Sequence, residues 1–426
     1  MNLFTRLARQ SLWLLIARVG AQVCMVIVTY LLARRLGTAG FGEYAFIATI
    51  IVIGNTLTTF GSDMYLIREI AAKADFSELP SVLVLQLILS CLFIASIFLL
   101  APYLPNQTAD SVLALKVYSF ALIPLAFFTV FTSVLRGTQR MRAYAWLNFA
   151  IPVFQVVVIF IFIKRGAGIV SLAYLLLGVQ TAGTILAGML CSSCFSNSKE
   201  LNISFDKLIS LFIACLPIAL IAVVGIIYQK LSLATLSFLG TTSMVGLFSA
   251  AARIVEAARM GHVAVFTALY PAMANVNQTK LSGAFRVSWL LLLLLSAVGS
   301  ALIYLFAKPV VDIFFGAEYG LSIPALKILA FTLIPYTVNS FLSLLFLAWK
   351  REQSVLRILM VSLLILFGLN LWLIPRTGQL GASWAILVAE TAQAILFLLA
   401  WLNSPLRQMD AIPSKGASYE FSDLSR

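Results

Sequence analysis

The feature that most constrains this chain is a succession of twelve apolar stretches separated by short polar segments. A helix of about 20 apolar residues spans the hydrocarbon layer of a bilayer. With 62% hydrophobic and 11% charged residues, the chain is too apolar for a soluble domain. The sequence therefore predicts an all-α polytopic membrane protein with twelve transmembrane helices. The predicted spans are 11–33, 41–62, 80–101, 113–135, 143–163, 169–191, 208–230, 244–268, 287–307, 322–348, 355–375 and 379–402.

The basic residues predict how these spans are oriented. Of the 29 lysines and arginines, seventeen lie at the N-terminus or in loops on its side of the membrane, and nine lie in the opposite loops. Cytoplasmic loops carry the basic excess, so both termini are predicted to be cytoplasmic. The formal net charge of +13 is then explained by topology and by contact with anionic membrane lipids, and we expect no nucleic-acid partner.

The two halves of the chain repeat. LALKVYSFALIP at 113–124 and PALKILAFTLIP at 324–335 share seven identities in twelve positions at an offset of 211, and LGTAGFGEYA at 36–45 matches LGTTSMVGLFSA at 239–250 with a short insertion. Matches six spans apart predict parallel repeats about an axis along the membrane normal, as in transporters. We expect six-helix lobes at 1–191 and 208–402, a cytoplasmic linker at 192–207 and a cytoplasmic tail at 403–426.

Ionisable residues inside the spans form one conspicuous group. Arg253, Glu256 and Arg259 follow one another at spacings of three in span 244–268, so neighbours can pair along the helix. Each charge at membrane depth costs about 2.5 to 3.5 kcal/mol on insertion scales and normally faces a protein interior or a watery cavity. The group is either an internal salt-bridge network or a functional site, and we favour the functional site. Glu256, Glu390 and Asp63 are candidates for coupling to H⁺ or Na⁺.

Polar side chains recur on faces of other spans. Arg18 and Gln22 share one face of the first span, Asn55 lies in the second, and Tyr336 and Asn339 share a face of the tenth. Any single residue of this kind can simply hydrogen-bond between helices. Together the faces predict a shared hydrophilic cavity.

Two lysines occupy matching positions in the repeat. Lys116 and Lys327 enter spans 113–135 and 322–348 from the non-cytoplasmic side. They either receive an anionic group near an exit or snorkel to lipid phosphates.

The sequence offers little for other chemistries. It has no nucleotide-binding phosphate loop and one histidine, and the Cys191 and Cys194 pair lacks a second pair that would complete a metal site. We therefore expect no enzyme activity, no metal and no cofactor.

Several segments together resemble the bacterial polysaccharide transporter family. They are LARRLGTAGFGEYAF at 32–46, FGSDMYLIREIA at 60–71, VGLFSAAARIVEA at 245–257, YPAMA at 270–274, FFGAEYG at 314–320 and GQLGASWA at 378–385. The family includes the Wzx-type flippases of O-antigen and capsule repeat units, within a superfamily that also holds multidrug and toxic compound exporters. The resemblance covers essentially the whole chain and implies a two-lobed, MATE-like fold.

The resemblance also implies a task, which is to move an undecaprenyl-diphosphate-linked oligosaccharide from the cytoplasmic to the periplasmic leaflet of the bacterial inner membrane. A polymerase and a chain-length regulator of the polysaccharide are possible partners. A diphosphate needs cationic groups in a low-dielectric path. Its predicted ligands are Arg18, Arg253, Arg259, Lys116 and Lys327.

We expect Gln22, Asn55, Tyr336 and Asn339 to contact the glycan. The alternatives are a cation-coupled multidrug or small-molecule exporter on the same fold, a precursor flippase of another polymer, and a membrane enzyme such as a polymerase or ligase. An exporter of cations is expected to have an acidic cavity, and an enzyme of that kind a large periplasmic loop.

Overall fold

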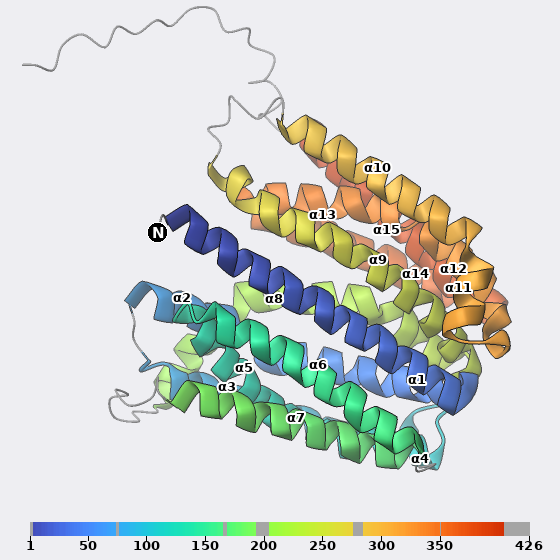
Figure 1. Ribbon diagram of the computed structural model, residues 1–426, viewed down its shortest axis with the longest axis horizontal. Coiled ribbons are helices and arrows are strands. Elements are labelled where there is room, and N and C mark those ends of the chain that lie inside the picture. Colours follow the sequence, from blue (N-terminus) through green and yellow to red (C-terminus); the bar gives the residue numbers. More distant parts are fainter. Residues whose placement is uncertain are drawn as a thin grey trace, which may run out of the picture.

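The computed structural model describes residues 3–73, 76–164, 168–192, 204–275, 284–349 and 351–403. Figure 1 shows an elongated bundle of helices, with no strand among the described residues. Residues 193–203 of the predicted linker at 192–207 and residues 404–426 of the predicted tail at 403–426 lie outside these residues, whereas residues 205–207 are helical. The first half contains α1 (Leu3–Thr59), α2 (Ser62–Lys73), α3 (Leu79–Leu100), η1 (Ala101–Tyr103), α4 (Ala109–Ser119), α5 (Leu122–Gly137), α6 (Met141–Lys164) and α7 (Ile169–Cys191). The second half contains α8 (Phe205–Leu239), α9 (Thr242–Asn275), α10 (Ala284–Leu305), α11 (Ala307–Phe314), η3 (Ala317–Ser322), α12 (Ile323–Ala330), α13 (Leu333–Ala348), α14 (Glu352–Thr377) and α15 (Gln379–Leu402).

The described helices supply the twelve predicted passes. Eight are long and apolar enough to cross a membrane, and two bent pairs raise the number to ten. The long α1 supplies one further pass, because Gly37 has φ 67° and ψ −176° and the chain reverses there. Glycine reaches positive φ without the steric cost that a Cβ brings. α9, whose 34 residues include Arg253, Glu256 and Arg259, is long enough to supply the twelfth.

The fourth and tenth spans are broken at equivalent places. α4 ends at Ser119 before α5, and α12 ends at Ala330 before α13, with a bend of 43° at the second break. Pro124 and Pro335 lie in the first turns of α5 and α13, where the missing N–H breaks no helical bond. Both prolines therefore sit just after the breaks.

The two repeat-related lysines have matching surroundings. Lys116 Nζ lies 5.5 Å from the centroid of the Phe98 ring, and Lys327 Nζ lies 4.9 Å from that of Tyr304. Such cation–π contacts are favourable at this distance. The sequence repeat between 113–124 and 324–335 is thus a repeat of local structure as well.

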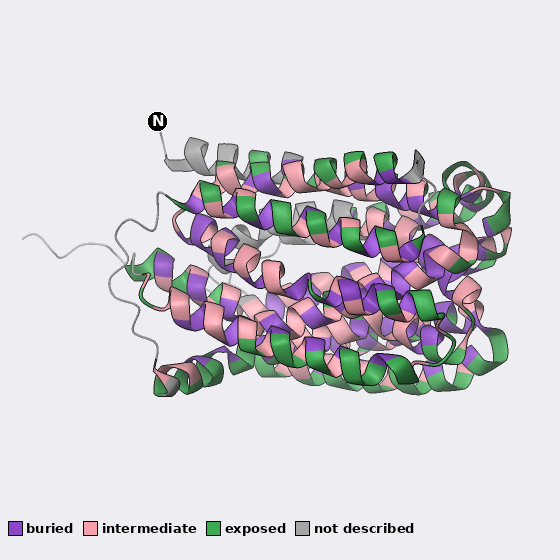
Figure 2. Ribbon diagram, turned by 90° about the horizontal axis from the view of Figure 1, so that it is seen from below, coloured by how far each residue is buried: buried purple, intermediate pink, exposed green. Residues whose placement is uncertain are grey.

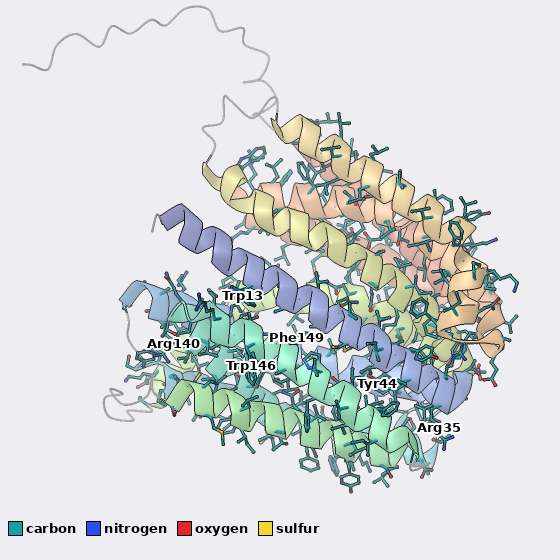
Figure 3. The ribbon with its side chains drawn as sticks, viewed as in Figure 1. Trp13, Arg35, Tyr44, Arg140, Trp146 and Phe149 are labelled. Carbon is teal, nitrogen blue, oxygen red and sulfur yellow. The ribbon has the colours of Figure 1, made fainter. Side chains whose placement is uncertain are left out.

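The outer surface of the bundle is apolar along its length. Large hydrophobic residues such as Leu92, Phe160, Leu294 and Leu364 are at least half exposed, and Figure 2 shows exposed residues recurring along the outer helices. A soluble protein rarely exposes so extensive an apolar surface, whereas lipid tails cover it without cost. Figure 3 places Arg35 at the end of the bundle where α1 reverses, which we call the Gly37 end.

The two halves touch most closely at the Gly37 end, where α1 crosses α9. A Cβ added to Gly42 would overlap the Thr242 carbonyl oxygen, and one added to Gly246 would overlap that of Thr38. Because only hydrogen atoms occupy these positions, the two backbones approach as closely as in small-residue crossings of membrane helices. The contact is reciprocal, since Thr38 and Gly42 repeat as Thr242 and Gly246.

Hydrogen bonds between the halves gather at the same end. Arg34 Nη2 donates to the carbonyls of Asp312 and Ile313 at 3.2 and 2.9 Å. The Tyr319 hydroxyl donates to the carbonyls of Ala33 and Gly37 at 3.1 and 3.0 Å. The Gly37 end is therefore closed between the halves.

The sequence boundary between the lobes differs from the packing boundary. Leu211 and Cys215, in the first turns of α8, are buried in a core cluster with Leu66, Val82 and Leu135 of the first half. Farther along, α8 packs against α14 of the second half. α8 therefore bridges the two lobes.

Candidate functional site: a cavity between the halves

A cavity of about 600 Å³ lies between the halves. It is bounded by α1 of the first half and by α8, α9, α11, α12, α13, α14 and α15 of the second. Its volume is in the range of about 300 to 1,000 Å³ that is usual for small-molecule sites. Most lining residues are apolar, and the charged ones are Lys230, Arg253, Glu256, Arg259 and Glu390. We call it the central cavity.

One carboxylate of the central cavity is shared by two cations. Glu256 Oε2 lies 3.2 Å from Arg253 Nη1 one turn earlier on α9, and Glu256 Oε1 lies 3.0 Å from Lys230 Nζ on α8. The three side chains are 17% to 40% exposed, so they border the open space. The predicted pairing of Arg253 with Glu256 is present.

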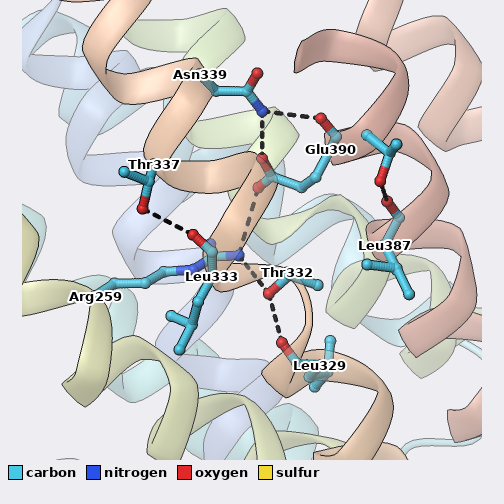
Figure 4. Close-up of polar contacts among 9 residues, drawn as sticks. Arg259, Leu329, Thr332, Leu333, Thr337, Asn339, Leu387 and Glu390 are labelled. Carbon is cyan, nitrogen blue, oxygen red and sulfur yellow. Dashed lines mark hydrogen bonds and ion pairs between the residues drawn. The ribbon is translucent and has the colours of Figure 1, made fainter. Parts of the chain in front are cut away.

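Arg259 is bound by the opposite wall of the cavity, as Figure 4 shows. Its Nη2 donates to Thr332 Oγ1 at 2.9 Å and lies 3.5 Å from Glu390 Oε1. The guanidinium also stacks over the Tyr336 ring, 4.3 Å from the centroid. Its ion pair is therefore with Glu390 of α15, whereas spacing along α9 suggested Glu256. The Arg259 Nε is buried and has no hydrogen-bond partner in the described part of the chain.

Asn339 hydrogen-bonds to both the side chain and the backbone of Glu390. The Asn339 Nδ2 donates to Glu390 Oε2 at 2.7 Å and to the Glu390 carbonyl at 3.0 Å. Both residues are only 5% exposed. A buried carboxylate needs such partners, because an unpaired one is costly at low dielectric. Glu390 therefore presents one oxygen to Arg259 while the other is occupied.

The charges that line the cavity do not cancel. Among the lining residues that the structure describes, three cations, Lys230, Arg253 and Arg259, face two carboxylates, Glu256 and Glu390. One positive charge is left over in a site largely walled by apolar side chains, where electrostatic interactions are stronger than in water. The cavity is suited to an anionic group.

Six of the predicted site residues line this cavity, and a seventh lies behind it. The lining residues are Gln22, Arg253, Glu256, Arg259, Tyr336 and Glu390, and Asn339 supports Glu390.

The other predicted residues lie elsewhere. Arg18 is exposed on α1, and Asn55 and Asp63 are half-buried outside the lining, Asp63 in the first turn of α2. Lys116 and Lys327 stack on the aromatic rings described above and do not line the cavity. The structure does not bring these five together with Arg253 and Arg259.

Lys230 is a cavity residue that the sequence analysis missed. The predicted span 208–230 ends at this residue and so places it at the membrane boundary, but α8 continues to Leu239. The apolar segment LSLATLSFL that follows Lys230 is the signal that could have placed it inside a helix.

Comparison with known proteins identifies the family. Residues 7–277, more than half of the chain, match the family described as polysaccharide biosynthesis protein. The chain belongs to this family. No curated protein matches it significantly by sequence.

Solved structures share the fold of this family member. An inward-facing multidrug resistance MATE family transporter of the MOP superfamily is 18% identical, with a TM-score of 0.73 over 92% of this chain and 96% of that one. The lipid II flippase MurJ in an inward closed conformation is 13% identical, with a TM-score of 0.70 over 93% and 89%. The MATE multidrug transporter DinF-BH, in complex with R6G, is 16% identical, with a TM-score of 0.72 over 97% and 98%. The chain is a multi-pass membrane protein with the fold of MOP-superfamily transporters.

Proposed function

We propose that the protein is a flippase that moves undecaprenyl-diphosphate-linked oligosaccharide repeat units, of O-antigen or a related surface polysaccharide, from the cytoplasmic to the periplasmic leaflet of the bacterial inner membrane. The observation that carries the proposal is the net positive central cavity, in which Lys230, Arg253 and Arg259 face two carboxylates. A diphosphate is a strong anion whose charge-assisted hydrogen bonds to arginine and lysine suit this site. Family membership supports a polysaccharide substrate.

The cavity also has features that suit the rest of such a substrate. Gln22, Gln229 and Tyr336 add uncharged polar groups to its lining for sugar hydroxyls. Val52 and Phe314 line the cavity and are 42% and 38% exposed, so the lining offers apolar side chains that suit the start of the polyprenyl tail. The polyprenyl tail can then stay in the bilayer while the head group crosses.

The proposed transport mechanism is alternating access. The Gly37 end is closed by contacts between the halves, so the head group enters from the opposite end, which we place at the cytoplasm. The halves then separate at the Gly37 end and release the head group into the periplasm. Glu256 and Glu390 are the carboxylates placed to couple this cycle to H⁺ or Na⁺.

The second candidate is a cation-coupled exporter of small cationic molecules. The two cavity carboxylates favour it, but each is paired with a basic side chain. A cationic substrate would have to displace at least one arginine or lysine from its partner. An anionic substrate instead meets one more basic than acidic side chain among the described lining residues.

Flipping in proteoliposomes tests the proposal. A fluorescent undecaprenyl-diphosphate oligosaccharide in the membrane is exposed to an impermeant quencher, and ethidium efflux is measured in parallel. We expect flipping above that of empty vesicles, reduced at least about tenfold by Arg253→Gln, because one charge-assisted contact is lost. The control Arg376→Gln removes an exposed arginine at the end of α14 and should flip normally. Ethidium efflux without flipping would replace the proposal by the exporter.

A further inference from the structure

The Arg259 guanidinium in the central cavity is incompletely paired. Its contact with Glu390 is a single long one, 3.5 Å between Nη2 and Oε1, at the upper end for an ion pair. An arginine has five N–H donors in a fork that matches two oxygens of a carboxylate or phosphate. Here Nε is buried without an acceptor. The guanidinium is thus oriented by Thr332 and Tyr336 but is left with unused capacity for an anion.

Asn339 prevents Glu390 from accepting hydrogen bonds from the remaining donors of Arg259. A free carboxylate would place both oxygens on an arginine, but Asn339 occupies Oε2 at 2.7 Å and also holds the Glu390 carbonyl. Both groups are 5% exposed, so water does not compete for them. Asn339 therefore restrains Glu390 in a weakened, one-oxygen contact.

Resting on the proposed function, we infer that Glu390 is an internal stand-in for the substrate diphosphate on Arg259, and that Asn339 is the positioning residue that keeps this stand-in weak enough to be displaced. While the cavity is empty, Glu390 prevents an uncompensated buried guanidinium, which is costly. When a diphosphate arrives, it takes the Nη2 and Nε donors of Arg259. When the halves open at the Gly37 end, the ion pair between Glu390 and Arg259 forms again, and this speeds release of the diphosphate.

Binding of farnesyl diphosphate, a probe with the diphosphate but no sugar, tests this exchange by calorimetry on the full chain in lipid nanodiscs. Glu390→Gln should tighten binding of farnesyl diphosphate about fivefold or more. This is the low end of the usual range for coupled binding equilibria, because the contact between Glu390 and Arg259 is long. Flipping of the oligosaccharide should become slower. Asn339→Leu should act in the opposite direction, because both oxygens of Glu390 become free to hold Arg259. A merely structural role predicts weaker binding in both variants.

A double-mutant cycle shows whether the effect acts through Arg259. The gain from Glu390→Gln should disappear in an Arg259→Gln background. The matched control is Glu256→Gln, which removes the same charge from the cavity, but whose partners are Lys230 and Arg253. The change in affinity that Glu256→Gln causes should persist in the Arg259→Gln background. Melting temperatures close to that of the wild type establish that the variants are folded.

The outcomes separate the inference from the proposed function. Unchanged or weaker binding by Glu390→Gln, or a gain that survives Arg259→Gln, overturns the inference while the flippase stands. Binding by Asn339→Leu at or above the wild-type affinity overturns the role of Asn339. Failure of the wild type to bind farnesyl diphosphate overturns the proposed function itself.

Discussion

The reciprocal contact of Gly42 and Gly246 makes a quantitative prediction about the conformational cycle. In Gly246→Ala the new Cβ would overlap the Thr38 carbonyl oxygen and lie 2.9 Å from its carbon, whereas real Cβ atoms essentially never approach within 3.0 Å. Both obstacles are backbone, so no side chain can turn aside. α1 and α9 must separate by roughly 1 Å, and overpacking of this kind typically costs about 1 to 3 kcal/mol.

That cost falls only on the state in which the Gly37 end is closed. The equilibrium should therefore shift toward opening at that end by about 5- to 150-fold. The opening can be measured by double electron–electron resonance between two spin labels attached to noncanonical amino acids. The labels replace Ala39 in the first half and Lys308 in the second, which are both exposed. We expect a longer-distance population to grow in Gly246→Ala and, by the repeat, in Gly42→Ala.

A control separates this effect from a general effect of alanine. Gly178 in α7 has no atom within 4 Å of an added Cβ, so Gly178→Ala should leave the distance distribution unchanged. If Gly42→Ala and Gly246→Ala also gave the wild-type distribution, the crossing would not hold the Gly37 end closed.

Two further variants test individual contacts. Lys230→Gln removes the extra positive charge of the cavity and should lower flipping in proteoliposomes at least about tenfold. Lys230→Arg keeps the charge and should retain most of the flipping. Equal rates for Lys230→Gln and the wild type would place Lys230 outside the substrate path. Tyr319→Phe loses the one hydroxyl proton that two carbonyls of α1 share, and should destabilise the protein by about 1 kcal/mol, seen as a lower melting temperature in detergent. Tyr304→Phe, at a 41% exposed ring, is its control, and equal melting temperatures would contradict the role of Tyr319.

The fold was predictable from the sequence because its main determinants are local. The length of the apolar runs fixes the passes, and the repeat fixes their relative direction. The matched surroundings of Lys116 and Lys327 follow from that repeat. The gap between the predicted spans 11–33 and 41–62 places a connection around Gly37. Its contact with the second half could not be predicted, because hydropathy does not report how closely two backbones approach.

The site was only partly predictable. Charges on α9 could be assigned to an interior, since exposure of Arg253 or Arg259 to lipid is costly. The partner of Arg259 could not be found from helical spacing, because Glu390 is 131 residues away and reaches it only through the packing of α15. Arg18 satisfied the same face pattern as Gln22 but is exposed and does not line the cavity, because the pattern along one helix does not fix how far the cavity extends along it.

The break between α12 and α13 differs from its counterpart between α4 and α5 in one residue that matters. Thr332 lies at the second break, where it donates to the Leu329 carbonyl at 2.6 Å and accepts from Arg259, while the equivalent position in the first half is Ala121. Because Thr332 lies at the bend itself, a change in the bend angle would displace the acceptor that Arg259 uses. Ala121 has no hydroxyl, so the two otherwise matching breaks differ in their connection to the central cavity.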